Sequence, residues 1–234
     1  MTTFALVHGG AHGGWCWEYV VGELSQLGHR AVTPDLPIED DDADLSDYAS
    51  TVVQALRDGD SDGDVVVVGH SMAGWTIPIV AAMHPVRRLI FLGAAVPAIG
   101  ISPVEQHARE PDMMSKELAV TAEQEGEFPI SGVEITWERA RRLFYHDVDE
   151  GIARKAWRRL RRQSLRCLEP LYPISAWPDV PSTYILMCDD RSVSPEWSRR
   201  YARDVLGADV IELSGSHSPF YSRPRELAEV LASL

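Results

Sequence analysis

The 234-residue sequence has few cysteines and no long hydrophobic run, and each shortage argues against a class of protein. Its three cysteines, Cys16, Cys167 and Cys188, are an odd number and show no C-x-x-C spacing, which favours reduced thiols in a cytoplasm. No stretch approaches the roughly 18 apolar residues of a membrane span. The apolar run at residues 4–7 is too short for a signal peptide. We therefore expect a cytoplasmic protein without a membrane segment.

Positive charge is also scarce in this chain. It has 22 Lys and Arg residues against 35 Asp and Glu residues, so its net charge is −13. This balance argues against a general affinity for nucleic acid and favours a soluble protein. The length suits one globular domain whose hydrophobic core is large enough to be stable alone.

The most informative motif is VVVVGHSMAG at residues 65–74. Four valines end at a glycine, Ser71 follows two residues later, and the apolar segment Trp75–Met83 has the length of a helix. This order predicts a strand, a sharp turn and a helix, with the Ser71 hydroxyl pushed out beyond the carboxyl edge of a sheet. The usual pattern of such a nucleophile turn is G-x-S-x-G, and here Ala73 and then Gly74 keep the last position small. The alternative is a serine in an ordinary strand-to-helix turn, where it would cap the helix.

A serine hydroxyl is a weak nucleophile and needs a base, together with an acid that orients the base. In hydrolases with such a turn, the chain order is Ser, then Asp or Glu, then His. The run Thr183–Cys188 predicts a buried parallel strand, and Asp189 and Asp190 follow at its carboxyl end, where ligands bind. We predict Asp190 as the acid, whereas Asp189 could instead cap the turn. The alternative is that both aspartates merely begin the loop before a helix at Pro195.

His217 is the candidate base. It lies in a loop of glycine and serine, after the short strand Val210–Leu213 and before a last helix that begins near Pro224. His70 directly precedes the serine and is expected to pack beneath the turn. Four other histidines are interpreted as surface or core residues, because a lone histidine is usually one of these: His29, His84, His107 and His146.

Attack of Ser71 on a carbonyl carbon creates an oxyanion. Hydrogen-bond donors held where that charge develops stabilise it by roughly 2.7–4 kcal/mol each. In this architecture one backbone N–H belongs to the residue after the nucleophile and one to a glycine-rich loop after an early strand. The strand at residues 4–7 is followed by HGGAHGGW at residues 8–15. We therefore predict an oxyanion hole formed by Met72 and Gly10, since glycine lets the backbone approach a substrate closely.

The same glycine-rich loop has two alternative interpretations. A nucleotide site is disfavoured, because residues 9–14 read G-x-A-x-x-G at best and the chain has no G-x-x-x-x-G-K-[ST] segment. A zinc site is disfavoured because the glycines between His8 and His12 argue against a helix there. We therefore expect no metal and no organic cofactor.

The pattern of predicted elements divides the chain into a body and an insertion. Strands and helices alternate over residues 1–96 and resume over 178–234, which predicts an α/β fold with a mostly parallel central sheet and helices on both faces. Residues 97–177 show no strong strand and are interpreted as a helical cap inserted over the carboxyl edge of the sheet. The expected helices cover residues 17–27, 46–57 with Ser46 as N-cap, 75–83, 103–109, 137–144 and 149–166.

Ten of the 22 basic residues lie between Arg139 and Arg166, within this cap. They would either attract an anionic substrate or partner, or form a solvated face that pairs with the acidic body, and the second interpretation is favoured. The cap also contains aromatic side chains that could line a pocket but are more often part of a core: Trp137, Phe144, Tyr145, Trp157 and Tyr172.

The glycine-rich loop, the serine turn, Asp190 and the segment Gly215-Ser216-His217, in this order, resemble the α/β-hydrolase superfamily. Within it, the chain is similar to the branch that holds plant methyl esterases and hydroxynitrile lyases, together with small bacterial esterases. The similarity covers both parts of the body, whereas the cap matches only in position and general helicity.

The resemblance also separates an esterase from a lyase. In the lyases a threonine follows the histidine of the first loop and a lysine follows the triad histidine, and these positions are Gly9 and Ser218 here. Neither lyase residue is present, so an esterase is favoured. Epoxide hydrolases and dehalogenases of this fold use a carboxylate nucleophile where this chain has Ser71, so they are disfavoured.

We therefore expect a serine hydrolase that cleaves a small carboxylic ester or thioester through an acyl-enzyme on Ser71, with His217 as base and Asp190 as acid. Two alternatives stay open: a ligand receptor or binding protein on a hydrolase scaffold, and a biosynthetic tailoring cyclase or lyase that uses the same pocket. The expected partner is a small-molecule ester, and the sequence leaves the oligomeric state open.

Overall fold

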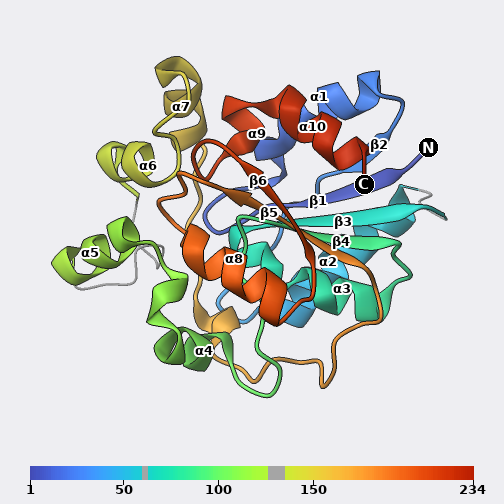
Figure 1. Cartoon of the computed structure of the whole chain (residues 1–234), viewed down its shortest axis with the longest axis horizontal. Helices are drawn as coiled ribbons and strands as arrows, with labels where there is room; N and C mark the ends of the chain where they lie inside the picture. The colour runs from blue at the N-terminus through green and yellow to red at the C-terminus, as the bar shows by residue number, and fades with distance from the viewer. Residues whose placement is uncertain (60–62, 126–134) are drawn as a thin grey trace.

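Figure 1 shows the computed structural model, which describes residues 1–59, 63–125 and 135–234. Within these residues six strands form one parallel sheet in the order β2-β1-β3-β4-β5-β6. The strands are β1 (Thr3–Val7), β2 (Arg30–Val32), β3 (Val65–His70), β4 (Arg88–Leu92), β5 (Ser182–Met187) and β6 (Asp209–Leu213).

Both faces of the sheet are buried, because side chains alternate along each strand. On β1, Ala5 and Val7 belong to one hydrophobic core, whereas Phe4 and Leu6 belong to the other. The first face is covered by α2 (Leu45–Asp58), α3 (Ile77–Met83) and α8 (Pro195–Asp204), and the second by α1 (Glu18–Gln26) and α10 (Pro224–Ala232) (Figure 1). The predicted α/β fold, with a parallel sheet between two helical layers, is thus confirmed.

Strand order and register decide where the loops meet. The order reverses between β1 and β3, the point at which ligands bind in open α/β sheets. Val7 pairs with Gly69, so the glycine-rich loop after β1 and the serine turn after β3 leave the sheet side by side. Met187 pairs with Leu213, so the loops that carry the predicted acid and base also follow neighbouring strand ends.

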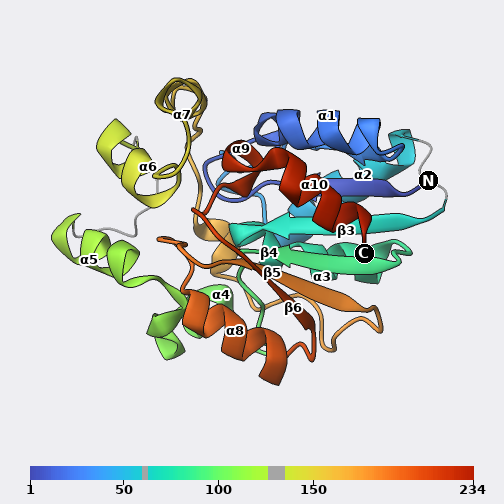
Figure 2. The same ribbon diagram turned by 45° about the horizontal axis from the view of Figure 1, so that its top comes forward.

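The described residues of the segment between β4 and β5 form helices and loops, and no strand. In both views α5, α6 and α7 lie beyond the carboxyl ends of the strands (Figures 1 and 2). The division into a body at 1–96 and 178–234 and a cap at 97–177 stays a prediction, and residues 126–134 lie outside the described residues. Where the structure describes the chain, no helix is both long enough and apolar enough to cross a bilayer. The α-helices between β4 and β5 are α4 (Pro103–Arg109), α5 (Lys116–Glu125), α6 (Trp137–Leu143) and α7 (Glu150–Trp157).

The predicted N-cap of α2 is wrong. Asp44, not Ser46, is the capping residue, and its Oδ1 accepts the backbone N–H groups of Ser46 and Asp47 at 2.6 and 3.0 Å. The Asp47 carboxylate accepts the Asp44 N–H at 2.9 Å in return, which completes a capping box. A carboxylate at this position also interacts favourably with the positive end of the helix dipole.

The helix predicted over 149–166 is too long, and α5 was not predicted at all. α7 ends at Trp157, after which the backbone makes hydrogen bonds to the body of the protein. The Arg161 N–H donates to the Ala11 oxygen at 2.8 Å, and the Ser164 N–H donates to the Ile38 oxygen at 2.7 Å. These tertiary bonds replace the ones that a longer helix would form.

Basic residues in and after α7 pair with acidic residues of the body. Among the described residues, five such ion pairs join the two regions, at distances between 3.0 and 3.7 Å. This confirms, for these residues, the interpretation that the basic segment pairs with the acidic body. The pairs are Lys155–Glu18, Arg159–Glu18, Arg161–Asp35, Arg161–Glu39 and Arg162–Asp41.

Candidate active site

The serine turn has the strained backbone that its motif predicts. Ser71 has φ +54°, a left-handed conformation that residues other than glycine rarely adopt. The flanking residues are small because no space is left: a Cβ at Gly69 would lie 2.7 Å from Ile77 Cγ2, and a Cβ at Gly74 would lie 1.8 Å from the Ala95 oxygen. Gly74 therefore serves as the final small residue of the motif, one position later than usual.

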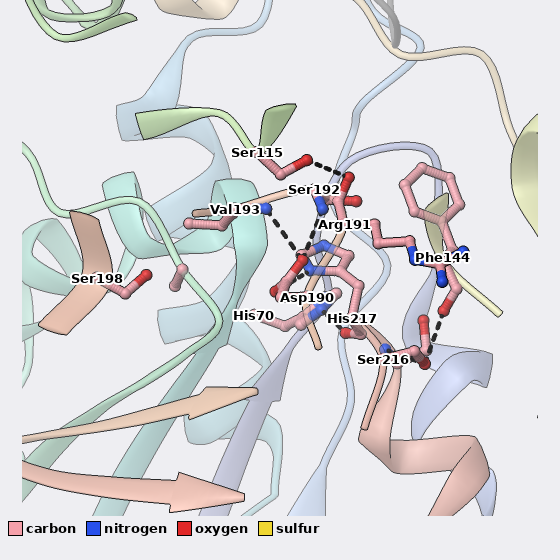
Figure 3. A network of polar contacts seen from close by, with 12 residues as sticks. His70, Ser115, Phe144, Asp190, Arg191, Ser192, Val193, Ser198, Ser216 and His217 are labelled. Atoms are coloured by element: carbon pink, nitrogen blue, oxygen red, sulfur yellow. Dashed lines mark hydrogen bonds and ion pairs between the residues drawn. The ribbon is translucent and has the colours of Figure 1, made fainter. Parts of the chain in front are cut away.

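His217 and Asp190 form a buried hydrogen-bonded pair. The His217 Nδ1 and the Asp190 Oδ2 are 2.8 Å apart, and both side chains are only 2% exposed (Figure 3). The other carboxylate oxygen of Asp190 accepts the backbone N–H groups of Ser192 at 2.7 Å and Val193 at 3.0 Å. Asp190 is thus fixed by the turn after β5 and holds the imidazole at Nδ1, which leaves Nε2 for chemistry.

Asp189, the other candidate acid, has a different partner. Its side chain is exposed, and its Oδ2 accepts the Gly215 N–H at 3.0 Å. It therefore ties the turn after β5 to the loop that leads to His217. These contacts make Asp190 the partner of the imidazole and give Asp189 the capping role that sequence analysis left open for it.

The loop that carries His217 is fixed from two sides. His70 Nε2 donates to the His217 carbonyl oxygen at 2.8 Å, and the centroids of the two rings are 4.5 Å apart. The Ser216 N–H donates to the Asp147 carboxylate at 3.0 Å, and the Ser216 hydroxyl donates to the Phe144 oxygen at 3.2 Å. Burial holds the pKa of His70 well below its ordinary value, so this ring stays neutral beside His217. The sequence predicts that His70 packs beneath the turn, but no motif indicates that it also supports the loop of His217.

A largely apolar cavity lies next to these side chains. It measures about 670 Å³, open solvent at its mouth included, and Ser71, His217, Gly10 and Met72 all line it. The structure thus brings four of the predicted site residues to one surface and places Asp190 behind His217. No Asp, Glu, Lys or Arg belongs to the lining formed by described residues. Apolar side chains form most of the wall: Trp75, Met113, Met114, Leu118, Phe144 and Leu168.

Two backbone N–H groups are available beside this cavity. Met72 lies in the first turn of the 3-10 helix η2 (Ser71–Trp75), whose first N–H groups have no acceptor within the helix. The Gly10 N–H shares a peptide group with the Gly9 carbonyl, which accepts a hydrogen bond from His8 Nδ1 at 2.9 Å. Because N–H and C=O point to opposite sides of a trans peptide, the Gly10 N–H points away from the His8 ring.

The histidines of the glycine-rich loop have no ring nitrogen left for a metal. His8 uses Nδ1 as described, and its Nε2 accepts the Leu36 N–H at 3.0 Å. His12 Nδ1 lies 2.9 Å from the Gly10 oxygen, and its Nε2 lies 2.8 Å from the Tyr145 hydroxyl. Burial lowers the pKa of His8 to about 4 and that of His12 to about 3, so both rings are neutral. Both side chains organise the loop through hydrogen bonds.

A parallel sheet with a strained serine turn at the point where its strand order reverses is the architecture of the α/β hydrolases. Residues 4–230 match the alpha/beta hydrolase family, and the chain belongs to that family. Esterase PIR7B of Oryza sativa subsp. japonica is 27% identical, with 99% of this chain and 94% of the relative covered. Methylesterase 7 of Arabidopsis thaliana is 25% identical, with 99% and 95% covered.

A solved structure gives the same picture of the fold. Polyneuridine aldehyde esterase superposes with a TM-score of 0.82 at 20% identity, over 100% of this chain and 98% of that chain. At this identity the likeness concerns the fold alone. Together with the curated relatives, it confirms the predicted resemblance to the branch that holds the plant methyl esterases.

Proposed function

We propose that Ser71, His217 and Asp190 form a catalytic triad, with Ser71 as nucleophile, His217 as general base and Asp190 as the orienting acid. The chain is an ester hydrolase, and the curated relatives that match it over nearly its whole length include an esterase and a methylesterase. One observation carries the assignment of roles: the buried 2.8 Å bond between His217 and Asp190, next to the cavity that Ser71 lines.

The reaction proceeds in two half-reactions. Ser71 Oγ attacks the carbonyl carbon of the ester while His217 Nε2 takes its proton, and Asp190 stabilises the resulting imidazolium through Nδ1–H. The imidazolium then gives this proton to the departing alcohol oxygen, which leaves an acyl group on Ser71. Water, deprotonated by His217, attacks the acyl carbon, and the returning proton restores the serine hydroxyl as the acid is released.

The negative charge of each tetrahedral intermediate needs hydrogen-bond donors. We assign this role to the Met72 and Gly10 N–H groups, which lie beside the cavity and have no acceptor among the described residues. Such donors are fixed before the reaction begins, so they stabilise the charge without a reorganisation cost.

The chemistry of the cavity supports a small, uncharged and largely apolar ester as substrate. A substrate anion would lose its hydration there without meeting an oppositely charged side chain in the described lining. Trp75 and Phe144 offer flat apolar surfaces, while Met72, Met113 and Met114 offer adaptable ones. Methyl esters belong among the candidates, because one matched relative is named a methylesterase. A thioester would react by the same steps.

Cyanide-releasing lyase chemistry is not supported. A Cβ at Gly9 would lie 2.7 Å from the Ser71 Cβ, so a threonine, the lyase residue at this position, has no room. Ser218 brings no positive charge to the base, whereas the lyases have a lysine there that stabilises departing cyanide.

Replacement of the nucleophile tests the proposal. Ser71→Ala is expected to lower kcat for p-nitrophenyl acetate and butyrate by about 10⁴- to 10⁶-fold, because the other groups cannot form the acyl-enzyme. The matched control is Ser50→Ala on α2, where the hydroxyl only donates to a carbonyl in its own helix. A fluorophosphonate probe should label the wild type and the control, but not Ser71→Ala. Unchanged hydrolysis by Ser71→Ala would refute the triad.

A cytoplasmic location is also part of the proposal. It is supported by the state of the cysteines, since Cys16, Cys167 and Cys188 are all unpaired and two of them are buried. Cell fractionation with an antibody against the chain tests this location, and recovery outside the cytoplasmic fraction would contradict it. The small-molecule ester is the expected partner.

A further inference from the structure

His12 is a buried side chain that the triad chemistry does not use. It belongs to the glycine-rich loop and is 1% exposed, and its ring lies between the Gly10 carbonyl and Tyr145, which follows α6 in the segment between β4 and β5. Its ring stacks on Trp15, with centroids 5.6 Å apart and an interplanar angle of 27°. Its two nitrogens contact the Gly10 oxygen at 2.9 Å and the Tyr145 hydroxyl at 2.8 Å.

The partners of His12 determine where its proton lies. The Gly10 carbonyl oxygen can only accept a hydrogen bond, so His12 Nδ1 carries the hydrogen. In the neutral ring Nε2 then carries a lone pair, and the Tyr145 hydroxyl donates to it. Burial lowers the pKa of His12 to about 3 and raises that of Tyr145 well above its ordinary value, which keeps both groups neutral.

The peptide groups on both sides of Gly10 are held by histidines. Before Gly10, the Gly9 carbonyl accepts from His8 Nδ1, and this sets the direction of the Gly10 N–H. After Gly10, its own carbonyl accepts from His12 Nδ1. A glycine rotates freely about φ and ψ, so both peptide planes must be fixed if the N–H is to keep one direction.

The next residue of the loop is held by the segment that follows α7. Ala11 has φ +59°, a strained conformation for alanine. Its N–H donates to the Gln163 side chain at 3.4 Å, and its carbonyl accepts the Arg161 N–H at 2.8 Å. The segment between β4 and β5 therefore forms hydrogen bonds with the loop through Tyr145, Arg161 and Gln163.

We propose that His12 is a positioning residue for the oxyanion donor: its Nδ1–H holds the Gly10 carbonyl, and the Tyr145 hydroxyl fixes the tautomer that makes this bond. The inference rests on the proposed function, because it needs a Gly10 N–H that binds the oxyanion. Without the Nδ1–H donor, the peptide after Gly10 turns and the N–H before it loses its alignment. The loss affects the transition state, whose charge the N–H stabilises, more than it affects substrate binding.

Three variants and one control test this inference. His12→Phe keeps a ring against Trp15 and Phe144 but removes both hydrogen bonds. His12→Asn leaves a cavity, yet its amide NH₂ occupies the place of Nδ1–H and still donates to the Gly10 oxygen. Tyr145→Phe removes only the donor that selects the tautomer. The control is Tyr221→Phe, the same chemical change in a ring next to Tyr145, with centroids 6.0 Å apart.

The expected results separate positioning from general stability. For p-nitrophenyl butyrate, His12→Phe lowers kcat by about 10- to 100-fold, which does not exceed the loss of about 10²- to 10³-fold caused by removing an oxyanion donor outright. The KM of this variant stays within about twofold of the wild-type value. The kcat of His12→Asn is about tenfold higher than that of His12→Phe, although the asparagine fills the site less well than the phenylalanine. Tyr145→Phe loses about two- to tenfold and Tyr221→Phe less than about twofold. The inhibition constant of a trifluoromethyl ketone, which forms an oxyanion on Ser71, rises in His12→Phe by the factor by which kcat/KM falls.

Three results would each overturn the inference while the proposed function stands. One is a wild-type kcat in His12→Phe, with Ser71 still labelled by a fluorophosphonate. A second is an equal loss of kcat in His12→Asn and His12→Phe. A third is a loss of kcat that follows the thermal unfolding midpoint of the variants instead of their affinity for the trifluoromethyl ketone. A wild-type protein that shows neither labelling nor hydrolysis would instead refute the proposed function.

Discussion

At the scale of single residues, strain and burial distinguish the proposed functional side chains from their neighbours. Ser71 adopts a left-handed conformation that costs free energy, and the tight packing around Gly69 and Gly74 maintains it. Asp190 is buried and bonded to His217, whereas the adjacent Asp189 is exposed and bonded to the backbone. Two aspartates that are adjacent in the sequence thus have different chemical environments.

The two aspartates provide a matched pair of substitutions. Asp190→Asn is expected to lower kcat by on the order of 10⁴-fold, because an amide cannot hold the His217 tautomer that carries hydrogen on Nδ1. Asp189→Asn keeps a side-chain oxygen for the Gly215 N–H and should stay within about threefold of the wild-type rate. Steady-state hydrolysis of p-nitrophenyl acetate measures both. A larger loss in Asp189→Asn than in Asp190→Asn would reverse the assignment of the acid.

At the scale of elements, side-chain hydrogen bonds determine where helices begin, and contacts with the rest of the molecule determine where they end. The N-cap of α2 lies two residues earlier than predicted because the Asp44 carboxylate accepts two N–H groups of the first turn. α7 ends early because the residues after Trp157 bond to Ala11 and Ile38 instead of continuing the helix. A helical pattern in the sequence carries no information about such distant acceptors.

The N-cap of α2 gives a prediction at this scale. Asp44→Ala should lower the free energy of unfolding by about 1 kcal/mol, because two N–H groups of the first turn lose their acceptor. Ser46→Ala, at the position that the sequence pattern favoured, should change it by less than about 0.5 kcal/mol. Urea denaturation followed by circular dichroism measures both values. An effect of Ser46→Ala equal to that of Asp44→Ala would contradict the capping geometry.

At the scale of the whole molecule, three neutral histidines are buried around the site in a strongly acidic protein. Burial lowers the pKa of His8 to about 4 and that of His12 to about 3, and it lowers that of His70 well below 6.5. In the unfolded chain these imidazoles regain their ordinary pKa of 6.5. Below that pH the unfolded state binds protons that the native state excludes, so acidification favours unfolding.

The free energy of unfolding should therefore be insensitive to these groups above pH 6.5 and should fall as the pH decreases from 6.5 towards 4. Each of the three histidines contributes at most about 1.4 kcal/mol per pH unit in that window. Urea denaturation over the window measures the slope. His12→Phe removes one of the three groups and should reduce their summed contribution to the slope by about one third. A stability that stays constant down to pH 4 would show that these rings are not excluded from protonation.

The sequence by itself determined the alternation of strands and helices in the two parts of the body, the serine turn, and which residues are candidates for the acid and the base. These features are local, because valine runs, glycines and the residues that end a strand act within a few positions of one another. Only the tertiary structure decided that His12 meets Tyr145, that Asp190 faces His217 while Asp189 does not, and that the chain after α7 holds the glycine-rich loop. These contacts depend on which strand ends become neighbours, and strand pairing is a property of the folded sheet that no short segment encodes.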